Sequence, residues 1–428
     1  MINTKEFYKT FLFVLLTFIS SRIISQTNIL MLSPLGEEYV AAYIIPNKFM
    51  IIDTIIIFAL APVVSIAVSG ENDLNSKKKI IKSFISFTLV LSVLLMIIGF
   101  IFYPILVNLF VNYKIQALAN IGIFWMNLSI PIRMLIFIFT MVLYSSPNNN
   151  KIWYVYLITI LLNVFLSWYF IYYQKLGFIG SYYSTFIIFF IEFLWLLYLV
   201  IDYIKSWPFT FFNIQIIYDL IKSILSEGFR LLSWQLEGFF IVALLSSREV
   251  WIPILSIYSI ISPFLDLILM PFIALMRSSS IEIAKFEKNN IYTAFNLIKN
   301  IKNQVLVFSV CFGIIMIFLS KILFENIYSL SGVRLVWWNT FIIIICLSLP
   351  IMAYGYLLRS CFQACSNFFE ISKFEILTSW FIYIPLIIFS IFNNNPFIFF
   401  ISFVLTEIII IFLLNRRLKF DRKIIQFD

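Results

Sequence analysis

Long apolar segments separated by short polar connections run through almost the whole chain. Between Phe11 and Leu414 these segments recur at a length of about twenty residues, which is what an α-helix needs to cross roughly 30 Å of hydrocarbon. The connections leave no room for a separate globular domain. The pattern predicts an all-α polytopic membrane protein with about twelve transmembrane helices, at residues 10–32, 40–69, 80–111, 118–145, 152–173, 178–203, 217–245, 250–279, 292–324, 336–365, 371–392 and 396–414.

Composition supports this class, and the charge indicates the orientation. Hydrophobic residues make up 62% of the chain and charged residues 12%, and the formal net charge is +9. Lysine and arginine are concentrated in the amino terminus, at Lys77–Lys79, at Arg277 with Lys285, and in the tail after residue 415. The positive-inside rule therefore predicts a multi-pass protein of the cell (inner) membrane with both termini in the cytoplasm. The basic charge then indicates membrane lipids rather than nucleic acid as partner, and we expect a monomer.

The two halves of the chain carry a weak internal repeat. Ala61–Ser69 aligns without a gap to Met270–Ser278, each with a proline at its second position and a basic loop after it. Further on, Ile105–Phe110 resembles Ile322–Ile327. Six helices per half make this a parallel repeat, with two bundles related by a pseudo-two-fold axis along the membrane normal. We expect an amino-terminal six-helix bundle over 1–205, a cytoplasmic connector over 206–216, a second bundle over 217–415, and a basic tail over 416–428.

Several chemistries are excluded by what the sequence lacks. There is no histidine and no large loop, which argues against an integral membrane enzyme and against histidine-ligated metals. The four cysteines lie in or beside apolar helices, and Cys361 and Cys365 have no further ligands for a metal, so we expect no metal site and no cofactor. A phosphate-binding glycine-rich loop is also missing, so neither ATP nor an ATPase partner is predicted as the energy source.

Carboxylates inside the apolar segments are the candidates for chemistry. Glu237 lies within the helix around Ser233–Leu245, where burying an ionised group costs several kcal/mol unless it faces a polar cavity, binds a cation or takes up a proton. Asp53 and Asp266 lie in the proline-bearing second helix of each half, where proline frees carbonyl groups that can help to bind an ion, and Glu192 lies midway along the sixth helix. We expect these four residues to be cation-coupling candidates. Hydration at an interface or a structural ion pair is the alternative for each.

Two stretches of the first half resemble a known family. Asn28–Gly36 with Ala61–Ser65, and Leu161–Val164 with Lys175–Thr185, are similar to the first, second, fifth and sixth helices of MATE (multidrug and toxic compound extrusion) transporters of the MOP flippase superfamily. The resemblance implies a cation-coupled antiporter, driven by sodium ions or protons, that exports amphiphilic or cationic organic compounds by alternating access of two bundles around a central cavity. It also implies that Glu237 takes the place of a seventh-helix glutamate that helps to bind the coupling cation.

The chain departs from the family pattern at two places. Many members carry an acidic residue where this chain has Asn28, and the tenth helix has no carboxylate to partner Glu237. Asn163 corresponds to an asparagine of the fifth helix, and we expect Asn28, Asn163, Gln235 and Arg133 to contribute to the substrate cavity. Arg133 could instead neutralise a buried carboxylate. Arg22 and Arg133 would hold a pyrophosphate in the alternative function, a polysaccharide-type flippase of a lipid-linked oligosaccharide.

Overall fold

Every regular element of the described chain is helical. The computed structural model describes residues 4–111, 113–146, 150–205, 214–246, 251–286, 290–324 and 332–425. Within them, eleven helices are long and apolar enough to cross a membrane, or twelve if the bent pair Ile115–Leu128 and Ile130–Tyr144 forms one span. The predicted all-α multi-pass architecture is confirmed. Residues 206–213, most of the predicted connector, lie outside this part of the chain.

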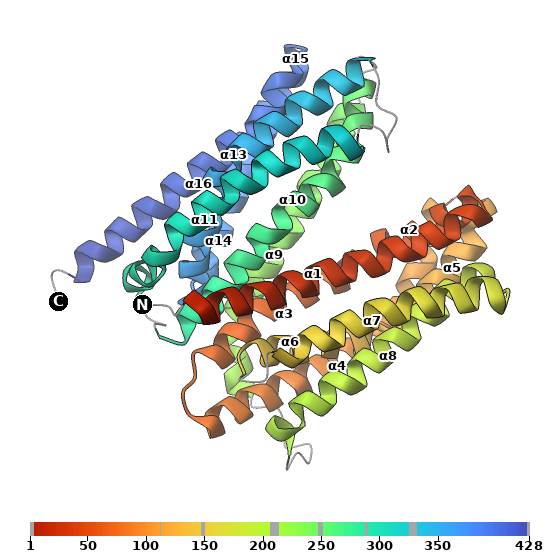
Figure 1. Cartoon of the computed structure of the whole chain (residues 1–428), viewed down its shortest axis with the longest axis horizontal. Coiled ribbons are helices and arrows are strands. Elements are labelled where there is room, and N and C mark those ends of the chain that lie inside the picture. Colours follow the sequence, from red (N-terminus) through yellow and green to blue (C-terminus); the bar gives the residue numbers. More distant parts are fainter. Residues whose placement is uncertain are drawn as a thin grey trace. The chain divides into compact units, whose positions relative to one another are not determined.

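The helix bounds agree closely with the hydrophobic pattern (Figure 1). The first half contains α1 (Thr4–Leu32), η1 (Ser33–Leu35), α2 (Glu37–Phe49), α3 (Ile51–Ser69), α4 (Leu74–Phe110), α5 (Tyr113–Leu128), α6 (Ile130–Tyr144), α7 (Asn150–Trp168), η3 (Tyr169–Tyr173) and α8 (Gly177–Ile204). The second contains α9 (Ile214–Ser246), α10 (Ile252–Ala284), α11 (Ile291–Leu319), η5 (Ser320–Phe324), α13 (Gly332–Ala364), α14 (Phe368–Thr378), η6 (Ser379–Tyr383), α15 (Ile384–Phe392) and α16 (Pro396–Ile425).

Two predicted helices are interrupted. The span predicted over 40–69 stops at Met50, whose ψ of 41° is not helical, and restarts as α3, while Pro62 lies inside α3 without ending it. The span predicted over 118–145 is bent by 46° at Ser129, where Pro131 in the first turn of α6 supplies no backbone N–H. The segments η3, η5 and η6 are π-helical turns, a form that frequently marks functional sites.

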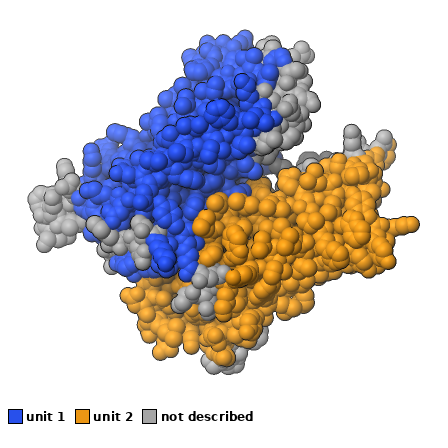
Figure 2. Space-filling view, viewed as in Figure 1, with its two compact units in different colours: residues 1–11, 225–428 blue, residues 12–224 orange. Residues whose placement is uncertain are grey.

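The chain divides into two compact units, shown in different colours in Figure 2. Unit 2 comprises residues 12–224, and unit 1 comprises residues 1–11 with 225–428. In unit 2, α6 contacts α3, α4 and α8, and α7 runs beside α8. In unit 1, α13 is the central helix and contacts α10, α11, α14 and α16. Because α13 is surrounded by these helices, its side chains Trp338, Leu349 and Phe362 are completely buried.

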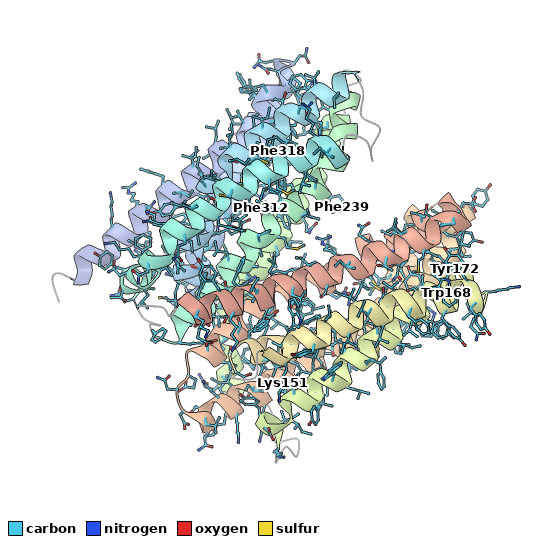
Figure 3. The ribbon with its side chains drawn as sticks, viewed as in Figure 1. Lys151, Trp168, Tyr172, Phe239, Phe312 and Phe318 are labelled. Atoms are coloured by element: carbon cyan, nitrogen blue, oxygen red, sulfur yellow. The ribbon has the colours of Figure 1, made fainter. Side chains whose placement is uncertain are left out.

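Large apolar side chains cover the outside of the helices. Phe239 of α9 and Phe318 of α11 are each 63% exposed, and Trp168 at the end of α7 is 48% exposed (Figure 3). Exposed aromatic groups of this kind are unfavourable in water, but they suit contact with lipid chains and the membrane interface. The surface therefore agrees with a multi-pass membrane protein.

Candidate ion-coupling sites

Glu237 lies in a small polar site of unit 1. Its side chain, on α9, is buried at 8% exposure and accepts a hydrogen bond from Ser379 of η6. One turn earlier, Ser233 Oγ accepts a hydrogen bond of 2.8 Å from Trp380 Nε1, the residue after Ser379. These two hydrogen bonds connect the π-helical turn η6 to α9 near Glu237. Tyr383, at the end of η6, also interacts electrostatically with the carboxylate of Glu237.

A second carboxylate reaches the same site from α10. The hydroxyl of Tyr258, on α10, interacts electrostatically with both Glu237 and Asp266. Asp266 lies two turns after Tyr258 on that helix and is half-buried. The tenth span offers Glu237 no carboxylate partner, whereas Asp266 of the eighth span shares its electrostatic interaction with Tyr258. We call the group of Glu237, Asp266, Tyr258, Ser379 and Tyr383 the unit 1 polar site.

No arginine or lysine of the described residues forms an ion pair with Glu237. The charged group that acts on it is Glu375, which has the same sign. Gln235 is half-buried two residues before Glu237. Because two residues turn a helix by about 200°, Gln235 faces away from the Glu237 side of α9. The unit 1 polar site thus offers carboxylate and hydroxyl oxygens, which suit a proton or a hard cation.

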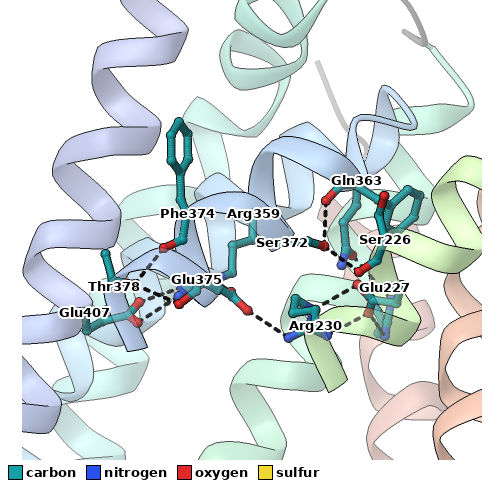
Figure 4. Close-up of polar contacts among 12 residues, drawn as sticks. Ser226, Glu227, Arg230, Arg359, Gln363, Ser372, Phe374, Glu375, Thr378 and Glu407 are labelled. Atoms are coloured by element: carbon teal, nitrogen blue, oxygen red, sulfur yellow. Dashed lines mark hydrogen bonds and ion pairs between the residues drawn. The ribbon is translucent and has the colours of Figure 1, made fainter. Parts of the chain in front are cut away.

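Three further acidic residues of unit 1, Glu227, Glu375 and Glu407, are neutralised by arginines in a buried ion network (Figure 4). Arg230 holds Glu227 through two hydrogen bonds of 2.7 and 2.9 Å and Glu375 at 3.0 Å. Arg359 holds Glu407 through two hydrogen bonds of 2.6 and 2.8 Å and Glu375 at 2.5 Å. Five helices, α9, α10, α13, α14 and α16, contribute to what we call the six-residue ion network, formed by Glu227, Arg230, Arg277, Arg359, Glu375 and Glu407.

Bidentate pairing explains how these charges are tolerated. An Arg and a carboxylate in fork geometry form two charge-assisted hydrogen bonds, which offset the cost of removing both ions from water. The carboxylate of Glu407, one of the intramembrane acidic residues of the sequence, is fully engaged by Arg359 in this way. Gly355 makes the pair possible, because a Cβ at that position would collide with Glu407 Oε1 and approach Arg359 Nη1 at 2.9 Å.

Asp53 is buried in unit 2 and interacts electrostatically with an arginine. Its side chain, on α3, is 0% exposed, and its Oδ1 accepts a 2.7 Å hydrogen bond from the Tyr103 hydroxyl of α4. Arg133 of α6 interacts with both groups. Among the described residues, Asp53 Oδ2 and Arg133 Nη1 are buried without a hydrogen-bond partner. Arg133 thus gives Asp53 a nearby positive charge, which Glu237 lacks among the described residues.

Asn28 lies at the centre of a neutral polar cluster in unit 2. Its Nδ2 donates to the Tyr43 hydroxyl at 2.9 Å and to Thr185 Oγ1 at 2.8 Å, and its Oδ1 accepts a 2.8 Å hydrogen bond from Ser167. Asn163 lies one turn before Ser167 on α7, and within the described residues both of its buried amide atoms are unpartnered. Without a charged member, this cluster cannot balance the charge of a cation.

Glu192 lies apart from these groups. It is on α8, 4% exposed, and it faces the hydroxyls of Tyr144 and Tyr156. The predicted coupling residues thus fall into three environments: the unit 1 polar site, the Asp53–Arg133 pair, and the surroundings of Glu192. The tyrosine and serine hydroxyls that complete these environments could not be recognised in the sequence, because similar side chains occur throughout the apolar helices.

Comparison with known proteins agrees with this architecture. The MatE family model matches residues 14–169. A MATE transporter in a bent conformation has a TM-score of 0.85 at 14% identity, with 98% of this chain and 96% of that chain covered. A Vibrio cholerae MATE transporter, VcmN, has 0.82 at 17%, with 97% of both chains covered. The chain has the MATE fold.

The MatE match over residues 14–169 and this fold agree with the resemblance to MATE transporters predicted from the sequence. A MATE transporter described as a multidrug resistance protein, in an outward-facing conformation, has a TM-score of 0.84 at 14% identity, covering 98% of this chain and 96% of that one. A MOP transporter from Pyrococcus furiosus has 0.80 at 15%, covering 100% and 96%, and was described as having a binding pocket of reversed polarity that suggests a different function. No curated protein matches the chain. At these identities, the MATE fold is shared and the substrate is a separate question.

Proposed function

We propose that this MATE-fold protein is a cation-coupled secondary transporter that exports amphiphilic or cationic organic compounds. The observation that carries the proposal is Glu237, a carboxylate buried at 8% exposure in a membrane-spanning helix, with hydroxyls around it and no basic partner among the described residues. An intramembrane carboxylate in this state favours binding of a proton or a metal cation, because either one removes the cost of an isolated charge. The coupling cation is a proton or a sodium ion.

Coupling follows from a difference in affinity between two conformations. A cation that binds the unit 1 polar site more tightly in one conformation shifts the equilibrium toward that conformation by its differential binding free energy. The hydrogen bond from Ser379 and the electrostatic contact with Tyr258 come from η6 and α10, so a small movement of either element against α9 changes the ligand set of Glu237. The π-helical turn η6 allows such an adjustment, because its backbone hydrogen bonds are not those of a regular helix.

The test is gradient-driven efflux from proteoliposomes loaded with a fluorescent organic cation. We expect Glu237→Gln, which keeps size and hydrogen bonding, to bind the substrate but to lose efflux driven by an imposed sodium or proton gradient. Asp266→Asn should weaken gradient-driven efflux as well. The matched control is Asp202→Asn, which removes an exposed carboxylate of α8 that pairs with Lys205 at the surface.

Two results would contradict the proposal. Unchanged gradient-driven efflux in Glu237→Gln would mean that this carboxylate has a structural role. If the wild-type protein moves no organic cation under either gradient, the proposed antiporter function is wrong. Flipping of a lipid-linked oligosaccharide should then be assayed. The flippase requires an arginine available to a pyrophosphate, whereas Arg133 faces Asp53.

A further inference from the structure

Glu192 is enclosed by hydroxyl groups from three other helices. The Tyr156 hydroxyl, on α7, interacts directly with its carboxyl group and is 2.8 Å from Thr140 Oγ1 of α6. The Tyr144 hydroxyl of α6 donates to Thr17 Oγ1 of α1 and also acts on Glu192. Both tyrosines are almost fully buried, at 5% and 2% exposure. We call Glu192, Tyr144, Tyr156, Thr17 and Thr140 the hydroxyl cluster of unit 2.

This cluster contains no positive charge within the described residues. The titratable groups that face Glu192 are Tyr144 from α6 and Tyr156 from α7, and α1 contributes only the neutral hydroxyl of Thr17. No described lysine or arginine from α4, α5 or any other element packed on α8 acts on the carboxyl group. Arg133, the buried arginine of the same unit, is directed to Asp53 instead. Glu192 differs in this respect from Glu227, Glu375, Glu407 and Asp53, which all have an arginine.

The surroundings of Glu192 favour a neutral carboxylic acid. A carboxylate removed from water without a counter-ion is disfavoured by several kcal/mol, and such a group commonly takes up a proton. A protonated carboxyl group can both donate and accept hydrogen bonds, which suits hydroxyl neighbours that can do the same. A bound metal cation would need several more oxygen ligands, but Tyr144 already donates to Thr17 and the Tyr156 hydroxyl is shared with Thr140.

We infer that Glu192, in the hydroxyl cluster of unit 2, is a proton-binding site, separate from the unit 1 polar site, and that its proton is exchanged during transport. The inference rests on the proposed function for its role in transport but not for the protonation itself. We expect the carboxyl group of Glu192 to be protonated in this conformation, because it has hydroxyl neighbours and no described counter-ion. Release transfers the proton from the carboxyl oxygen to a water molecule that reaches the cluster, and leaves the carboxylate accepting a hydrogen bond from the Tyr156 hydroxyl.

Infrared spectroscopy of the purified full-length protein tests the protonation without any transport. A protonated carboxylic acid has a carbonyl stretch that a carboxylate lacks. We expect this band in wild type near neutral pH, its partial loss in Glu192→Gln, and its retention in the control Asp202→Asn, where the carboxylate is exposed. Tyr156→Phe should shift the band without removing it, because one hydrogen bond to the carboxyl group is lost. An identical band in wild type and Glu192→Gln would overturn the inference, as would a band that Tyr156→Phe leaves unshifted.

Efflux from proteoliposomes tests the role in transport. We expect Glu192→Gln to abolish efflux driven by a proton gradient, and proton-driven efflux at the wild-type rate would overturn the role. If the infrared band is assigned to Glu192 while the wild-type protein moves no organic cation under any gradient, the proposed function fails and the proton site stands. If wild type is gradient-driven but Glu192→Gln has no infrared effect, the proton site fails and the proposed function stands.

Discussion

Removing Arg359 is the most direct perturbation of the six-residue ion network. Arg359 is 5% exposed, and its guanidinium group makes a bidentate contact with Glu407 and a third hydrogen bond to Glu375. In Arg359→Met, Glu375 still pairs with Arg230, but Glu407 loses its only basic partner among the described residues and stays in the interior of unit 1. The variant therefore tests the cost of one uncompensated buried carboxylate.

The expected loss of stability is large. Removing one partner of a buried ion pair costs about 3–5 kcal/mol, because the remaining charge is left without compensation. This corresponds to a shift of roughly a hundredfold to a few thousandfold in the unfolding equilibrium. Arg359→Met combined with Glu407→Gln removes both charges, so the double variant should be more stable than Arg359→Met alone, since replacing a whole buried pair is often close to neutral.

The measurement is unfolding of the detergent-solubilised protein by denaturant, followed by tryptophan fluorescence, for the wild type, both single variants and the double variant. Lys205→Met is the control, because the Lys205–Asp202 pair is about three-quarters exposed and should contribute about 0–1 kcal/mol. The reasoning is refuted if Arg359→Met unfolds like wild type, or if the double variant is as unstable as the sum of its single changes, since contacting groups must show coupling.

Three further predictions concern packing, capping and orientation. Gly180→Ala should destabilise unit 2 by about 1–3 kcal/mol in the same unfolding assay, because the added Cβ would lie 2.7 Å from the backbone carbonyl carbon of Phe170. In the control Gly238→Ala, the added Cβ meets nothing within 4 Å, so this variant should be as stable as wild type or more stable. The backbone N–H and the hydroxyl of Ser76 both donate to Asp73 and hold the pKa of that carboxyl group below its usual value. The ionised Asp73 therefore stabilises the start of α4 above about pH 3.9, and this stabilisation is lost as the pH falls through the lowered pKa. Hydrogen exchange of the first turn of α4 should show this loss in wild type and not in Asp73→Asn. For orientation, after replacement of the four native cysteines, a cysteine at Ser76 should be labelled only from the cytoplasmic side and one at Asn394 only from outside, and the reverse result would contradict the proposed topology.

The helices could be predicted from sequence because the membrane imposes one length and one polarity on each span. All twelve predicted spans correspond to helices of the structure, with most bounds within about six residues, while α16 extends to Ile425, well past the predicted end at residue 414. The break at Met50 has no such signature, since neither it nor its neighbours are residues that usually end a helix. Pro131 does carry a signal for the bend at Ser129, but a proline near the middle of an apolar run is compatible with either a kink or a continuous helix.

The polar sites were predictable only as single residues. Glu237, Glu192, Asp53 and Asp266 stand out because each is an acidic residue in an apolar segment, and the structure gives all four polar surroundings. Their partners depend on which helices are neighbours, which a single sequence does not contain. Arg133 could be matched to Asp53 only after α3 and α6 were seen to pack together. For the same reason, Glu407 of α16 could not be matched to Arg359 of α13 from the sequence.

The six-residue ion network also has an electrical consequence. Its three arginines and three glutamates carry formal charges that cancel. A unit charge that moves through the whole membrane potential gains or loses about 2.3 kcal/mol per 100 mV, but a group of charges that moves together and sums to zero does no net work. Any displacement of the network along the membrane normal is therefore insensitive to voltage. Glu237 has no such compensation, so its own contribution to the voltage dependence of such a movement depends on whether its carboxyl group is charged.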